Sequence, residues 1–355
     1  FWLKDAAPAA LASRGASGVP RREGGAREPR KMAALLRLVL GGAVCAVGSF
    51  CYAMLNILSQ LSKEPDGSYA YSMPAVVLAS EFVKLCLSIG FLARDDASSL
   101  RSVVTAPPTA WMPFAVPSVL YAINNNLDML NNQYMDPATE SVLAQGKILT
   151  TGLAWWLVFK KPLSALKWLS LVLLFIGCCG AGWPTPSADA AKNAMYIEPF
   201  GLVLVSLYIC ISATAGVYNE WLYKRKGHAN VSIHLLNIRL YTIGCIVCLG
   251  GHWWFRPDGA QAPLLENLFH GFNFYTWAMV ANYSVMGLLL SQVLKHFDSL
   301  VKLLISGFSM YASAFMTRVI FGRVPSMQFV CSLAFVAAAI ALYNLETFRP
   351  QSHKD

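Results

Sequence analysis

The sequence predicts an all-α membrane protein in which ten transmembrane helices form two inverted halves of five. Its 355 residues are 56% hydrophobic and 13% charged, with a mean hydropathy of +0.47. Soluble domains carry about 25% charge. Apolar runs of about 20 residues, long enough to cross a bilayer as helices, recur along the chain. The two halves also match each other at an offset of 162 residues. The net charge of +9 suggests nucleic acid, but the apolar composition excludes it as a partner.

The expected organisation begins with a disordered basic tail over residues 1–32, rich in Ala, Gly, Pro and Arg. Met32 would serve as an initiator, because no preceding apolar run is long enough for a signal peptide. An Arg-rich transit peptide is the alternative, although the Pro and Gly content disfavours an amphipathic helix. The remaining expected units are half one (33–183), a linker (184–198), half two (199–344) and a cytosolic tail (345–355).

Ten apolar segments fill the two halves, and turn residues such as Pro65-Asp66-Gly67 and Pro257-Asp258-Gly259 separate them. We expect helices over 35–60, 74–93, 111–133, 138–159, 164–183, 199–223, 233–255, 272–294, 300–322 and 326–344. The connections are short. The sequence therefore predicts no inserted soluble domain.

The basic residues of the loops set the orientation, because cytosolic loops carry the excess of Lys and Arg. An even helix count puts both termini on one side. That side carries Arg94, Arg101, Lys160, Lys161, Lys167, Lys224, Arg225, Lys226, Lys295, Arg349 and Lys354. The opposite side carries Lys63, Lys192, Arg256 and Arg323. We therefore expect both termini in the cytosol.

The internal match pairs an Asp turn, a helix end and the start of the next helix in each half. At the offset of 162, the matching pairs are Asp136 with Asp298, Phe159 with Phe321, Lys161 with Arg323, and Ser164 with Ser326. Five helices per half is an odd number, so the second half would be inverted. Inverted repeats with a binding site at their interface are a transporter architecture.

Polar groups within the apolar segments predict a ligand-binding cavity. Lys147 lies mid-segment, where a charge is costly in lipid and usually faces a ligand or a water-filled path. The structural alternative is pairing with a nearby carboxylate. Lys302 lies about one turn into its segment. Lysines suit phosphate and aromatic rings suit a nucleobase. Glu81 and Lys84, spaced i, i+3, are expected to neutralise each other.

The nine cysteines all lie in apolar segments, so we expect packing roles rather than disulfides. Cys245-x-x-Cys248 lacks the second ligand pair that a zinc site needs. The six histidines are scattered. The sequence predicts neither a metal nor a cofactor.

Six segments, in order, closely resemble the nucleotide-sugar transporter family, in the branch that includes CMP-sialic acid, UDP-galactose and UDP-N-acetylglucosamine transporters. They are YAINNNL, DPATESVLAQGKILTT, LSALKWLSLVLLFIGC, ATAGVYNEWLYK, LLNIRLY and LKHFDSLVKLLIS. The resemblance spans most of residues 40–345.

The resemblance implies ten helices of the drug/metabolite transporter fold in the Golgi membrane, with the endoplasmic reticulum as the alternative location. It also implies an antiporter that exchanges a cytosolic nucleotide sugar for a lumenal nucleoside monophosphate, and no enzymatic activity. By matching positions, the implied substrate-binding residues are Lys147, Lys302, Asn125, Asn126, Asn237, Tyr241, Gly216 and Tyr218. Membrane lipid surrounds such a protein, and a homodimer remains open as an alternative to a monomer.

The fourth segment departs from the family pattern. Glu140-Ser141 replaces a Tyr-Gln pair and Ala144 replaces a Tyr. We expect Glu140 to contact sugar or ribose hydroxyls, with Lys147 partly compensating its charge. The loss of these rings keeps open a non-transporting membrane scaffold that retains the fold. A membrane-embedded glycosyltransferase is disfavoured, because the sequence shows no paired lumenal carboxylates and no metal motif.

Overall fold

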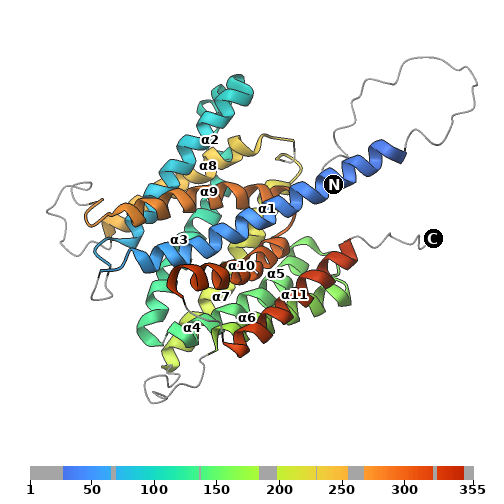
Figure 1. Ribbon diagram of the computed structural model, residues 1–355. Helices are drawn as coiled ribbons and strands as arrows, with labels where there is room; N and C mark the ends of the chain where they lie inside the picture. Colours follow the sequence, from blue (N-terminus) through green and yellow to red (C-terminus); the bar gives the residue numbers. More distant parts are fainter. Residues whose placement is uncertain are drawn as a thin grey trace, which may run out of the picture.

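In the computed structural model, the chain is a bundle of α-helices (Figure 1). The structure describes residues 27–64, 69–135, 137–183, 198–228, 230–254, 268–322 and 326–347. Within these ranges there is no β-strand, which confirms the predicted all-α class. Residues 1–26, the linker up to residue 197 and residues 348–355 lie outside them.

The helices follow the predicted order. They are α1 (Arg27–Leu61), α2 (Met73–Val104), α3 (Met112–Tyr134), α4 (Pro137–Leu143), α5 (Lys147–Phe159), α6 (Ala165–Gly182), α7 (Pro199–Lys224), α8 (Ile233–Trp254), α9 (Phe274–His296), α10 (Ser299–Phe321) and α11 (Met327–Thr347). Short 3₁₀ segments cover Pro108–Ala110 and Ala144–Gly146.

Polar caps fix several of these boundaries. The Ser164 side chain accepts a hydrogen bond from the Lys167 backbone N–H and starts α6. Asn273 and Thr276 form a capping box at the start of α9. Gly322, with a left-handed backbone (φ 66°), ends α10.

The second helix is longer than predicted, because it continues past the expected end near residue 93 to Val104. Its backbone breaks at Asp96 (φ −157°, ψ 83°). There the Asp96 carboxylate accepts hydrogen bonds from the Ser98 hydroxyl at 2.5 Å and from the Ser99 backbone N–H at 3.3 Å. Asp96 therefore acts as an internal N-cap that starts a second helical stretch.

The predicted helix over 138–159 is interrupted. Helices α4 and α5 flank a 3₁₀ turn over Ala144–Gly146, directly before Lys147. A Cβ at Gly146 would lie 3.0 Å from the Ile209 side chain of α7, so glycine permits a close approach between the helices. A 3₁₀ turn inside a helix often marks a functional hinge.

Eight helices, α1, α2 and α6 through α11, are long and apolar enough to cross a membrane, judged by length and composition in the described residues. In α3, only Met112–Asn124 forms a shorter apolar stretch, and α4 and α5 are each short. The helices outside this set are thus those with the polar residues of 121–151.

The helices pack in recurring pairs. Helix α6 packs along α11 and α2 along α8, at opposite sides of the bundle (Figure 1). Between them, α1 contacts α9 and α10, while α7 contacts α3 and α5. Helix α2 also packs on α9, and α3 on α8. Helices α3 and α5 of half one therefore lie against helices of half two.

Candidate ligand-binding site

Two lysines lie inside the bundle, each near a tyrosine ring of another helix. The Lys302 ammonium of α10 lies 5.9 Å from the ring centre of Tyr121 on α3. The Lys147 ammonium, at the start of α5, lies 5.8 Å from the ring centre of Tyr208 on α7. Both lysines are partly exposed. Aromatic faces attract cations, so four helices contribute to two cation–aromatic positions.

Tyr121 and Tyr208 were not predicted as site residues. Tyr121 lies one turn before the asparagine run of α3, so its position was a usable signal. Tyr208 lies two turns before Gly216 in an otherwise apolar stretch, and nothing in the sequence distinguishes it from a packing residue.

Gly216 faces open space inside the protein. The residue is buried, yet a Cβ built on it would meet no atom within 4 Å. Among the described atoms there is therefore open space beside Gly216, which we call the hollow. Tyr218, two residues further along α7, instead lies against Trp221, with 5.4 Å between ring centres. Of these two predicted residues, Gly216 is the one that borders the hollow.

Asn237 and Tyr241 of α8 lie in a packed polar layer. The Asn237 amide oxygen accepts from the Tyr223 hydroxyl at 3.0 Å, and its NH₂ group donates to the Ser291 hydroxyl at 2.9 Å. Asn237 is 1% exposed and Tyr241 is 3% exposed. The described contacts of Asn237 are with α7 and α9. Its contact with a ligand remains a prediction.

The predicted Glu81–Lys84 pair is confirmed. The Lys84 ammonium lies 2.5 Å from the Glu81 carboxylate and 4.7 Å from the Tyr241 ring centre. Glycines on α8 and α9 make room for the pair, since a Cβ at Gly244 would lie 2.9 Å from Glu81 and one at Gly287 would lie 2.6 Å from Lys84. The pair is built into the contact between α2, α8 and α9.

The remaining predicted residues lie on α3 and α4. The side chains of Asn125 and Asn126 lie outside the described part of the structure. Their neighbour Asn124 has a buried amide oxygen without a hydrogen-bond partner among the described residues. Glu140 is partly exposed on α4. The 3₁₀ turn rotates α5 by roughly 60° relative to a continuous helix, so Glu140 and Lys147 no longer share one strict face.

The site is suited to an anionic ligand with an aromatic part. Two lysines supply charge for phosphate, and tyrosines and a hollow beside Gly216 supply aromatic surface and room. In the described residues, no group of three or more His, Cys, Asp or Glu side chains could hold a metal ion.

Comparisons with known proteins identify relatives over most of the chain. Residues 39–344 match the sequence profile of the family described as "Nucleotide-sugar transporter". "CMP-sialic acid transporter 1" of Oryza sativa subsp. japonica is 31% identical over 291 residues, which cover 81% of this chain and 89% of the relative. "Probable UDP-sugar transporter protein SLC35A4" of Homo sapiens is 29% identical over 339 residues, covering 90% and 96%.

A solved crystal structure has the same fold. It covers 88% of this chain and 99% of its own, with a TM-score of 0.61 and 14% sequence identity. At this identity the likeness concerns the fold alone.

Proposed function

The chain belongs to the nucleotide-sugar transporter family, and from this premise we propose that it is an antiporter. It would carry a UDP- or CMP-linked sugar from the cytosol into the Golgi lumen in exchange for nucleoside monophosphate. One observation carries the proposal. Lys147 and Lys302 lie inside a membrane-spanning bundle, each near a tyrosine ring.

Alternating access by two inverted halves of five helices is part of the proposal, with α4 and α5 counted as one broken helix. The packing supports it. If each helix of half one is exchanged with its equivalent in half two, the α1–α10 contact becomes α7–α5, α1–α9 becomes α7–α3, and α2–α9 becomes α8–α3. The α2–α8 and α6–α11 contacts map onto themselves. Such a two-fold pattern is expected of an inverted repeat.

The broken fourth helix supports a site beside Lys147. Discontinuous helices form the substrate sites of many transporters, because their interrupted backbone lines a cavity. Here the interruption ends directly before Lys147. We place the phosphates between the two lysines, and the hollow beside Gly216 next to them.

We propose that Glu140 discriminates among sugars. An ionised carboxylate about 5 Å from a phosphate charge would cost on the order of 3 kcal/mol at an effective dielectric of 20. Glu140 would therefore contact hydroxyl groups instead. We expect Glu140→Gln to retain monophosphate binding while changing the ranking of a nucleotide-sugar panel, measured by competition. The same ranking in both proteins would leave Glu140 as a structural residue.

The alternative is a membrane scaffold without transport. It is favoured by Glu140 and Ala144, which stand where the family pattern has tyrosines. Purified protein in proteoliposomes distinguishes the two. We expect uptake of labelled UDP- or CMP-sugar to rise severalfold when the vesicles are preloaded with the matching monophosphate. Absence of uptake across the panel, with folded protein, would favour the scaffold.

A further inference from the structure

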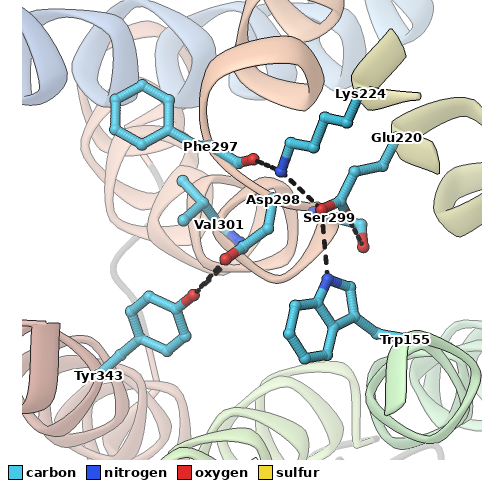
Figure 2. A network of polar contacts seen from close by, with 8 residues as sticks. All are labelled: Trp155, Glu220, Lys224, Phe297, Asp298, Ser299, Val301 and Tyr343. Carbon is cyan, nitrogen blue, oxygen red and sulfur yellow. Dashed lines mark hydrogen bonds and ion pairs between the residues drawn. The ribbon is translucent and has the colours of Figure 1, made fainter. Parts of the chain in front are cut away.

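A hydrogen-bonded network links four helices at one end of the bundle (Figure 2). Its centre is Glu220 of α7, which is 1% exposed. One carboxylate oxygen of Glu220 accepts from the Trp155 indole N–H of α5 at 3.2 Å and from the Lys224 ammonium at 2.7 Å. The other accepts from the Ser299 backbone N–H and hydroxyl of α10 at 2.7 and 2.8 Å.

The network extends from α10 to α11. Lys224 also donates to the Phe297 carbonyl oxygen. The next residue, Asp298, caps α10 by accepting from the Val301 N–H at 2.8 Å. The Tyr343 hydroxyl of α11 lies 3.0 and 3.1 Å from the two Asp298 oxygens. In Figure 2, Trp155 approaches Glu220 from α5, whereas Lys224 lies one turn beyond Glu220 on α7 itself.

The network lies on the same side of the proposed site on three helices. Glu220 is about 6 Å beyond Gly216 along α7, Ser299 about 4.5 Å before Lys302 along α10, and Trp155 about 12 Å beyond Lys147 along α5, from the helical rise per residue. It therefore lies to one side of Gly216, Lys302 and Lys147 along the bundle. In the proposed orientation this is the cytosolic end.

At the opposite end, the position equivalent to Glu220 holds no carboxylate. At the repeat offset of 162, Leu58 corresponds to Glu220 and Ser62 to Lys224. Leu58 is buried in an apolar cluster with Val76 and Met279. The two ends are therefore held by different chemistry. A fully hydrogen-bonded buried carboxylate is costly to unpair, which favours closure at the Glu220 end.

We propose that Glu220 is the central residue of a cytosolic gate. Its hydrogen bonds to Trp155 and Ser299 hold α5, α7 and α10 together, and these bonds must open before a ligand reaches Lys302 from the cytosol. The identity of the ligand that passes this gate depends on the function proposed above. The gate itself can be tested without any substrate.

The test measures access to a reporter thiol at Gly216, where a Cβ has free space. Microsomes present their cytosolic face outward, so a membrane-impermeant maleimide added outside reports cytosolic access. We expect Gly216→Cys alone to react slowly and the double variants with Glu220→Gln or Trp155→Phe to react about tenfold faster. This is the change in an opening equilibrium expected for loss of one hydrogen bond to a charged group. Peptide mass spectrometry separates this thiol from Cys210, which lies on the same helix.

Ser164→Ala is the matched control, because it removes a cap from α6 and Ser164 is not among the described hydrogen-bond partners of Glu220. It should leave the labelling rate unchanged. Trp155→Phe keeps the aromatic bulk and removes one hydrogen bond, which protects the test against misfolding of Glu220→Gln. Equal labelling rates in Gly216→Cys and in Gly216→Cys with Trp155→Phe, both folded, would overturn the gate. Rapid labelling of Gly216→Cys alone would also overturn it. Faster labelling in a protein that transports nothing would retain the gate and refute the transport function.

Discussion

Lys147 and Lys302 place positive charge in an apolar bundle, and each lies near the face of a tyrosine ring. A ring face attracts a cation without neutralising its charge. Neither tyrosine ring therefore removes the charge of its lysine.

We expect Lys147→Ala and Lys302→Ala each to weaken monophosphate binding by about 10- to 100-fold, the value of one charged hydrogen bond. Exchange in proteoliposomes and monophosphate binding to the purified protein would show the effect. Lys63→Ala is a matched control, because Lys63 lies 5.3 Å from the Tyr69 ring centre, just beyond the end of α1. If removing Glu140 together with Lys147 restores exchange, Lys147 serves as a counter-ion and not as a ligand.

His228 lies in the loop between α7 and α8, where it is 6% exposed. Because a carbonyl oxygen only accepts, its Nδ1–H donates to the Leu222 carbonyl oxygen at 2.8 Å. Burial lowers the pKa of His228 from its ordinary value of 6.5, and the cations Arg225, Arg239 and Lys295 add to this effect. The folded protein therefore binds a proton less readily than the unfolded chain.

It follows that the stability His228 confers is complete above pH 6.5 and declines as the pH falls toward the lowered folded-state pKa. We expect the melting temperature in detergent to drop between pH 7.5 and 5.5, and to drop less in His228→Gln. His270→Gln, an exposed histidine at a turn, should melt with the parent's pH dependence. An identical pH dependence in His228→Gln and the parent would contradict the assignment.

At the scale of the helix, glycine decides how closely α6 and α11 pack. A Cβ at Gly177 would lie 2.8 Å from the Val336 side chain and 3.0 Å from the Ser332 carbonyl oxygen. A backbone carbonyl cannot relieve the contact by changing rotamer, as a flexible side chain can. The two helices must therefore separate to admit a methyl group.

We expect Gly177→Ala to lower the free energy of unfolding by about 1–3 kcal/mol, as is usual for overpacking. Thermal or denaturant unfolding of the purified protein would measure it. Gly250→Ala on α8 is the control, because its Cβ would meet nothing within 4 Å. Alanine is the better helix former there and should be neutral or stabilising by up to about 1 kcal/mol. Equal stability of the two variants would show that α6 and α11 can shift without cost.

The helices follow closely from the sequence, because the length of apolar runs and the turn residues between them are local properties. The end of α2 and the break before Lys147 could not be predicted in this way. The first depends on side-chain capping by Asp96, and the second on the close approach of Ile209 to Gly146. Local apolar patterns carry neither signal.

The candidate site was partly predictable for a similar reason. A lysine in an apolar segment is visible in the sequence, as is the i, i+3 spacing of Glu81 and Lys84. The four donors around Glu220 come from residues 155, 224 and 299, so only the fold brings them together. Family membership, suggested by six segments in order, is confirmed over residues 39–344.

At the scale of the whole molecule, the orientation in the membrane decides which end the Glu220 network closes. The chain contains two N-x-S sequons, at Asn230 and Asn282. Asn282 donates to the Cys51 carbonyl oxygen at 2.8 Å within the bundle, so no orientation exposes it to glycosylation. Asn230 is exposed in the loop between α7 and α8 and is the usable reporter.

With both termini in the cytosol, Asn230 faces away from the lumen, where glycosylation occurs, and should remain unmodified. Met195→Thr completes a sequon at Asn193 in the loop expected on the lumenal side, and this variant should gain a glycosidase-sensitive shift in gel mobility. Asn193 precedes α7 and Asn230 follows it, so the two sites lie on opposite sides of the membrane. In any single orientation, only one of them can be glycosylated. Glycosylation of Asn230 without glycosylation of Asn193 would show that the orientation is the reverse of the one proposed. The network would then close the lumenal end, and the cytosolic entrance would be the end held by Leu58 and its apolar neighbours.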